Sequence, residues 1–150
     1  MLDKGIKQFL RDVEWGELDY LIVDMPPGTG DAQLTMANST SLSGGVIVTT
    51  PQDVALLDGM RGLTMFQKME VPILGFVENM SYFQPAGSSE QYEIFGRGGG
   101  RKLAEESEVP FLGELPLDPA VRMGGDNGVP IVAADPNSPV TLAFIKKEKK

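Results

Sequence analysis

Residues 20–31 read Tyr-Leu-Ile-Val-Asp-Met-Pro-Pro-Gly-Thr-Gly-Asp, so a continuous apolar run ends in a carboxylate and a glycine-rich turn. In nucleotide hydrolases, an apolar strand delivers such a carboxylate to a glycine-rich turn, where it holds magnesium near the phosphates. Magnesium keeps several of its waters, so one carboxylate, Asp24, is enough to hold the ion through a water molecule. Gly28 and Gly30 lack a Cβ atom, which lets backbone N–H groups approach a phosphate closely. Alternatively, Asp24 only caps a turn. The complete sequence of residues 24–31 makes this alternative less favoured.

Three further apolar runs and several helical patterns follow along the chain. The runs are residues 46–48, 73–77 and 111–115; helices are expected over 3–14, 31–42, 54–69, 101–108 and 139–147, and a turn or short helix over 118–124. Apolar runs without alternation indicate strands covered on both faces. Strands separated by helices imply right-handed crossovers in a parallel sheet. We therefore expect an α/β fold with a doubly wound, mostly parallel sheet, in one domain over residues 1–150 with no second domain.

Ligands of such sheets bind beyond the carboxyl ends of the strands, where polar or turn-forming residues follow each run. After the third run comes Asn79, whose amide offers a donor and an acceptor together. This pair matches the N7 acceptor and the exocyclic amine of adenine. Taken alone, an Asn at a strand end is usually a turn former. The segment Pro116-Leu117-Asp118, after the fourth run, could flank the other side of the base.

Two other motifs leave alternatives open. The hydroxyls of Thr49 and Thr50 could reach a phosphate or a magnesium-bound water, or could form a local turn before a helix that Pro51 begins. The run from Gly96 to Leu103 suggests a phosphate loop, but it lacks the G-x-x-x-x-G-K-[S/T] pattern. A flexible glycine loop before a helix is the favoured interpretation.

Composition narrows the possible chemistry. The chain has no Cys, which excludes disulfides and thiolate-bound metals within it, and no His, the commonest proton shuttle. The last five residues contribute +3 to the net charge of −8, so residues 1–145 carry −11 and should repel nucleic-acid phosphates. No apolar run reaches the roughly 18 residues of a membrane span. We expect no nucleic-acid or membrane partner, and the lack of a signal-like N-terminus favours the cytoplasm.

Together, these motifs resemble a known family over nearly the whole chain. The chain resembles the Mrp (ApbC-like) iron–sulfur cluster carrier ATPases, relatives of MinD and ParA. The residues that carry the resemblance are 15–20, 24–31, 49–58, 78–83 (Glu-Asn-Met-Ser-Tyr-Phe), 94–96 and 116–119.

The resemblance implies an ATP-binding homodimer that carries a [4Fe–4S] cluster and delivers it to apo-proteins. Asp24 would be the magnesium-water carboxylate, and Gly28 and Thr29 would act with it in catalysis. The nucleotide-binding residues would be Asp24, Pro27, Gly28, Asn79, Pro116, Leu117 and Asp118. The chain would supply the Walker B, switch II and adenine-side half of one P-loop ATPase domain.

Two departures from the family pattern matter. The family's phosphate loop lies roughly a hundred residues upstream of the Asp24 motif and has no counterpart here, so we expect this chain to be the C-terminal portion of a longer protein. The strand that carries that loop would sit between the strands matching 19–24 and 45–50. Many members also carry a Cys-x-x-Cys in the region that here spans 84–93, and this chain offers no iron–sulfur ligands there.

Two other functions remain as alternatives. One is a truncated, non-enzymatic dimerisation or scaffold module without ATPase activity, which the missing phosphate loop favours for the chain as it stands. The other is a MinD- or ParA-like positioning ATPase, which the short lysine tail and the acidic body disfavour.

Overall fold

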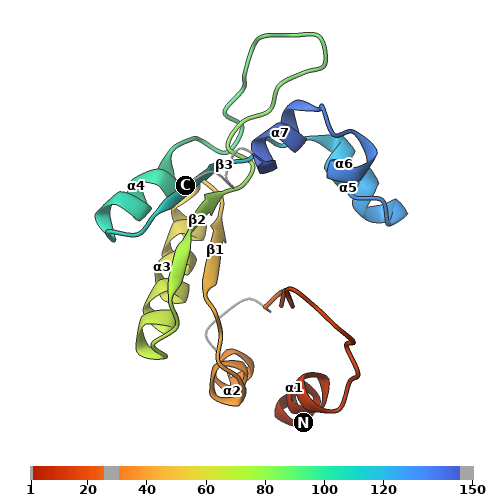
Figure 1. Ribbon diagram of the computed structural model, residues 1–150. Helices are drawn as coiled ribbons and strands as arrows, with labels where there is room; N and C mark the ends of the chain where they lie inside the picture. The colour runs from red at the N-terminus through yellow and green to blue at the C-terminus, as the bar shows by residue number, and fades with distance from the viewer. Residues whose placement is uncertain (1, 26–30, 146–150) are drawn as a thin grey trace. The chain divides into compact units, whose positions relative to one another are not determined.

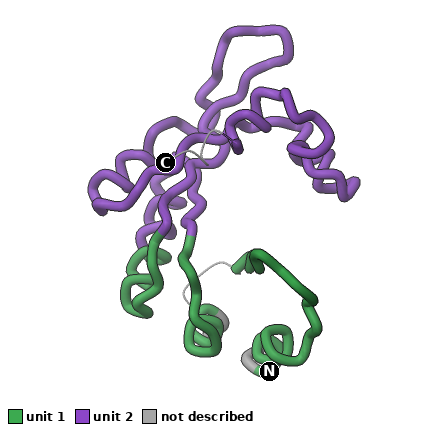
Figure 2. Tube along the Cα trace, viewed as in Figure 1, with its two compact units in different colours: residues 1–45, 61–73 green, residues 46–60, 74–150 purple. Residues whose placement is uncertain are grey.

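The computed structural model describes residues 2–25 and 31–145 (Figure 1). The chain forms two compact units, and each unit is built from two stretches of sequence (Figure 2). Unit 1 contains residues 1–45 and 61–73, and unit 2 contains residues 46–60 and 74–150.

Unit 1 begins with two helices that pack on each other, α1 (Leu2–Arg11) and α2 (Asp31–Ser39). The first was expected from the spacing of apolar residues and the second from Asp31 as an N-cap, and both end about three residues earlier than predicted. Met36 of α2 is buried. Near the end of the unit, the N–H of Gly45 donates to the carbonyl of Pro72 at 2.8 Å.

Residues 20–23 were expected to form the first strand, and this prediction was wrong: within the described part of the chain they belong to no strand. Their side chains nevertheless alternate as in an extended chain. Tyr20 and Ile22 are 84% and 86% exposed, whereas Leu21 and Val23 are 45% and 38% exposed. A strand needs a neighbour that pairs with its backbone N–H and C=O groups. The apolar run therefore has the side-chain pattern of a strand without a ladder.

The parallel sheet has the strand order β1-β2-β3, with the strands side by side (Figure 1). The strands are β1 (Gly45–Thr49), β2 (Ile73–Glu78) and β3 (Phe111–Glu114). Strands β2 and β3 are parallel, with Phe76 opposite Phe111 and Glu78 opposite Glu114. The helix α3 (Asp53–Lys68) connects β1 to β2, and α4 (Gly99–Glu106) connects β2 to β3. This alternation confirms the predicted α/β class.

The core of unit 2 forms around Phe76, which has no exposed surface. Ile47 of β1, and Leu103 and Ala104 of α4, are also buried. The expectation that the strands are covered on both faces fails at β1, whose residues alternate between buried and exposed. Val48, for example, is 61% exposed. Within the described residues, one face of β1 thus remains open.

Three short helices complete unit 2. They are α5 (Pro119–Asn127), α6 (Ile131–Ala134) and α7 (Pro139–Ile145), and each contacts the next. The predicted final helix corresponds to α7, whereas α6 has no clear signal in the sequence. Thr141 of α7 is fully buried, and its hydroxyl donates to the carbonyl of Asp135 at 2.7 Å. None of the helices in residues 2–25 and 31–145 is long and apolar enough to cross a membrane.

A glycine in the middle of α3 tests the packing of this core. An added methyl group at Gly59 would lie 3.5–3.8 Å from Phe76, Leu103 and Ile47, at ordinary van der Waals distance. Alanine is favoured over glycine in helices, so Gly59→Ala should raise the free energy of unfolding by about 1 kcal/mol in urea titrations. Gly62→Ala in the same helix is the control, because its methyl group meets no atom within 4 Å. A loss of stability at Gly59 alone would contradict the described packing.

Candidate functional site

The ends of β2 and β3 are joined by backbone hydrogen bonds that continue past both strands. The N–H of Leu115 donates to the carbonyl of Glu78 at 2.8 Å, and the N–H of Ser81 donates to the carbonyl of Leu115 at 3.0 Å. The N–H of Leu117 then donates to the carbonyl of Tyr82 at 2.7 Å. The structure therefore brings two predicted site segments together: the one that contains Asn79 and the one that spans residues 116–118.

Asn79 occupies the turn at the end of β2. Its N–H donates to the carbonyl of Thr49 at 2.7 Å, which ties the turn to the end of β1. Its Oδ1 accepts from the N–H of Met80 at 3.0 Å, and Met80 has a φ of 56°. This contact uses one lone pair of Oδ1. The second lone pair and the NH₂ group remain as the acceptor and donor that the carboxamide can offer a ligand.

Asp118 has a structural task that the sequence analysis did not assign. It is the N-cap of α5, and its Oδ1 accepts from the N–H of Ala120 at 2.8 Å. Such a cap satisfies one of the unpaired donors of the first helical turn. Pro116 and Leu117, directly before it, are half-buried. Within this segment, they offer the apolar surface that could flank a ring.

The threonines after β1 make local contacts. The hydroxyl of Thr49 donates to the carbonyl of Thr50 at 3.2 Å, and the hydroxyl of Thr50 donates to Oε1 of Gln52 at 3.0 Å. These contacts favour the local-turn interpretation of the two that the sequence left open.

Glu78, the last residue of β2, is the main site feature that sequence reasoning missed. Its side chain is fully buried. Oε1 accepts from the N–H of Gly98 at 2.9 Å and from the Ser81 hydroxyl at 2.8 Å, and Oε2 accepts from the N–H of Gly100 at 2.6 Å. The glycine-rich run, expected to be a flexible loop, is thus held by a carboxylate of the same chain. The signal available in the sequence was a Glu at the end of a strand together with the three consecutive glycines of residues 98–100.

A second carboxylate, Glu114 at the end of β3, binds the arginines that flank these glycines. Nε and Nη2 of Arg97 donate to Oε2 of Glu114 at 3.0 and 2.7 Å, and this hydrogen bonding raises the pKa of Arg97. Nη2 of Arg101 lies 3.4 Å from Oε1 of Glu114. The two guanidinium groups also stack on the rings of Tyr82 and Phe111, at 4.8 and 4.4 Å from the ring centroids.

Residues 84–93 form a long loop between β2 and α4 (Figure 1). Phe83 and Tyr92 exchange two backbone hydrogen bonds of 2.8 Å at its base. The hydroxyl of Tyr92 donates to Glu90 at 2.7 Å, and this hydrogen bond raises the pKa of Tyr92. The chain has no thiol. Among the described residues, no group of three His, Cys, Asp or Glu side chains could hold a metal ion. This donor set does not fit an iron–sulfur cluster.

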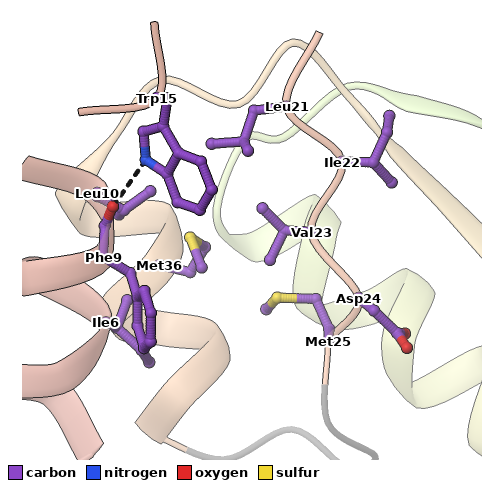
Figure 3. A pocket seen from close by; sticks show the side chains of 10 residues that line it. All are labelled: Ile6, Phe9, Leu10, Trp15, Leu21, Ile22, Val23, Asp24, Met25 and Met36. Carbon is purple, nitrogen blue, oxygen red and sulfur yellow. Dashed lines mark hydrogen bonds between the residues drawn. The ribbon is translucent and has the colours of Figure 1, made fainter. Parts of the chain in front are cut away.

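Asp24 lies in unit 1, beside an apolar pocket of about 330 Å³. The pocket is lined by Ile6, Phe9, Leu10, Trp15, Leu21, Ile22, Val23, Asp24, Met25 and Met36. The carboxylate of Asp24 points away from the side chains of α1 (Figure 3), and Asp24 is exposed. The other predicted residues of this motif, Pro27, Gly28 and Thr29, lie outside the described residues.

Comparison with known proteins identifies relatives across the whole chain. The ParA family, described as NUBPL iron-transfer P-loop NTPases, matches residues 1–150. An iron–sulfur cluster carrier protein of Synechocystis is 60% identical over 139 residues, which are 92% of this chain and 39% of that protein. The mouse iron–sulfur cluster transfer protein NUBPL is 47% identical over 145 residues, which are 97% of this chain and 46% of that protein. The chain thus spans less than half the length of these two relatives.

Solved structures show the same relationship. A nucleotide-binding protein of Archaeoglobus fulgidus, solved in complex with ADP, superposes with a TM-score of 0.78 at 36% identity, covering 95% of this chain and 57% of that one. The cell division ATPase MinD of Pyrococcus furiosus superposes with a TM-score of 0.69 at 27% identity, covering 97% and 56%. The chain therefore belongs to the ParA family of NUBPL-type iron-transfer P-loop NTPases.

Proposed function

We propose that this chain supplies the magnesium side and the adenine side of an ATP-dependent iron–sulfur cluster carrier. In the whole protein, a phosphate loop would accompany these residues and hold the triphosphate. The whole protein would bind and hydrolyse ATP as a homodimer and would deliver clusters to apo-proteins. The names of the relatives support the carrier assignment, and the ADP complex of the Archaeoglobus protein supports a nucleotide as ligand.

The observation that carries this proposal is the joining of the two strand ends in unit 2. Backbone hydrogen bonds hold the segment of Asn79 beside residues 115–117, at the carboxyl edge of the parallel sheet. Ligands of open α/β sheets bind at that edge. The NH₂ group of Asn79 would donate to N7 of adenine and its Oδ1 would accept from the exocyclic amine, where guanine carries an acceptor instead. Pro116 and Leu117 would pack against the ring. Asp118 would act indirectly, by capping the helix that follows.

The magnesium side would be built by the motif after residues 20–23. Asp24 is exposed, and a carboxylate is the hard oxygen ligand that suits magnesium through water. Magnesium would neutralise charge on the phosphates. Gly28 would offer a backbone N–H close to the γ-phosphate, and Pro27 would stiffen the approach to it. Thr29 would act with Asp24 and Gly28 in catalysis.

The cluster would be a cargo, and the residues of this chain do not fit it. Iron–sulfur clusters need thiolate ligands, and the chain has no Cys. A cluster carried by the whole protein would therefore need ligands from outside these 150 residues.

The first test compares ATP binding by the 150-residue chain and by the whole protein. Three lost hydrogen bonds to phosphate remove roughly 5–9 kcal/mol, and a micromolar site has only about 8 kcal/mol in total. We expect the chain alone to show no micromolar binding of a fluorescent ATP analogue, and the whole protein to bind it. Micromolar binding by the chain alone would refute the proposal that a phosphate loop outside these 150 residues supplies most of the binding free energy. A coding sequence without a phosphate loop upstream of Met1 would instead favour a scaffold module.

The second test concerns Asp24. In the whole protein, Asp24→Asn should lower the kcat of ATP hydrolysis by about 100-fold, because the amide no longer holds a magnesium-bound water as a carboxylate does. Steady-state phosphate release measures this effect. Asp19→Asn is the matched control, since Asp19 is also exposed but precedes the apolar run. An unchanged kcat in Asp24→Asn would exclude the magnesium role.

The third test concerns the cargo. After anaerobic reconstitution with iron and sulfide, the 150-residue chain should show neither cluster absorbance in the visible range nor bound iron, because it has no thiolate. The whole protein, treated in parallel, should gain both. A cluster stably bound by the chain alone would show that other ligands suffice.

A further inference from the structure

The glycine-rich run of residues 96–103 follows the long loop and includes the first turn of α4. It resembles a phosphate loop because three backbone positions are glycine, but the anion at its N–H groups is the carboxylate of Glu78. Each glycine has its own physical reason. Gly98 has a φ of +85°. A methyl group at Gly99 would lie 2.7 Å from the carbonyl oxygen of Pro51, and one at Gly100 would lie 3.1 Å from Oε2 of Glu78.

The same carboxylate closes the turn that carries Asn79. Glu78 and Ser81 are both fully buried, and the Ser81 hydroxyl donates to Oε1 of Glu78 at 2.8 Å. Asn79 and Met80 form the tip between these two anchored residues. Met80 has a positive φ, which a non-glycine residue adopts only where its surroundings hold it. The N–H of Met80 in turn holds Oδ1 of Asn79.

The glycine-rich run is also fastened to the neighbouring strand end. Arg97 and Arg101, on either side of the glycines, both reach Glu114 at the end of β3. Leu115, the next residue, donates its N–H to the carbonyl of Glu78. The run therefore links the two strand ends that carry the proposed base-binding segments.

We propose that Glu78 is a positioning residue for the nucleotide base: its buried carboxylate, bound to the N–H groups of Gly98 and Gly100, holds the turn in which Asn79 presents its carboxamide. This inference rests on the proposed nucleotide function. Glu78 itself does not contact the base, because both of its oxygens are engaged within the protein. It acts on affinity for the base and on selectivity between bases, through Asn79.

The test uses the whole protein and isothermal titration calorimetry with MgATP and MgGTP. In Glu78→Gln, an NH₂ group replaces one of the two acceptors, so one of the donors at this site loses its partner. The affinity for ATP should fall about tenfold, and the preference for ATP over GTP should fall by a similar factor, because the phosphate contacts are shared by both nucleotides. Glu105→Gln is the matched control: Glu105 is an exposed carboxylate of α4, and its variant should bind like the unaltered protein.

A double-mutant cycle with Asn79→Ala separates positioning from general stability. If Glu78 acts through Asn79, Glu78→Gln should cost no further selectivity in the Asn79→Ala background. Additive losses, or an unchanged preference for ATP in Glu78→Gln, would overturn the inference while leaving the proposed function in place. If the unaltered protein binds ATP and GTP equally, the adenine assignment fails, and the inference falls with it.

A second variant covers the case in which Glu78→Gln does not fold. Gly100→Ala favours the helix but places a methyl group 3.1 Å from the Glu78 side chain, which must shift. We expect a smaller loss of the preference for ATP, in the same direction. Gly62→Ala, whose methyl group meets no atom within 4 Å, is its control and should keep the full preference. A folded Gly100→Ala protein with undiminished preference would contradict the positioning role.

Discussion

A carboxylate without exposure to solvent needs hydrogen-bond donors at both oxygens, because no water solvates it. At Glu78 the donors are two backbone N–H groups at the start of α4 and the hydroxyl of Ser81. The first N–H groups of a helix have no partners within the helix, and its dipole favours a negative charge at this end. One interaction thus caps α4, fastens the glycine-rich run and closes the turn after β2. An unpaired buried donor would cost about 1–3 kcal/mol.

The parallel pairing of β2 and β3 extends this constraint to the edge of the sheet. After the strands end, backbone hydrogen bonds still join residues 78–82 to residues 115–117. The ion pairs of Glu114 with Arg97 and Arg101 lie at the same edge. Because they are partly exposed, they contribute little to the free energy of unfolding, but they hold the glycine-rich run beside the end of β3. The candidate base site is therefore a product of two strand ends and of the loop that links them.

Much of the element order was predictable, because apolar spacing and glycine or proline punctuation act locally. The helices α1 to α4 and the strands β1 to β3 all lie where the sequence places them, within a few residues. Residues 20–23 are the exception. Their apolar pattern is that of a strand, but strand formation also depends on a pairing partner, and in the described residues none accompanies them. The open face of β1 has the same kind of cause, since covering a strand requires other elements.

The features of the candidate site also fall into two groups: those that the sequence predicts and those that only the tertiary structure shows. By itself, the sequence determined the fold class, the order of most elements and the position of Asn79 at a strand end, because these depend on residue type and spacing along the chain. It also excluded thiolate chemistry, since the chain has no Cys. Only the tertiary structure decided that Glu78 is buried against Gly98 and Gly100. The partners of Glu78 lie 20 and 22 residues away from it, and a contact over that separation is selected by packing and by the demand of a buried charge for donors, which no local pattern records.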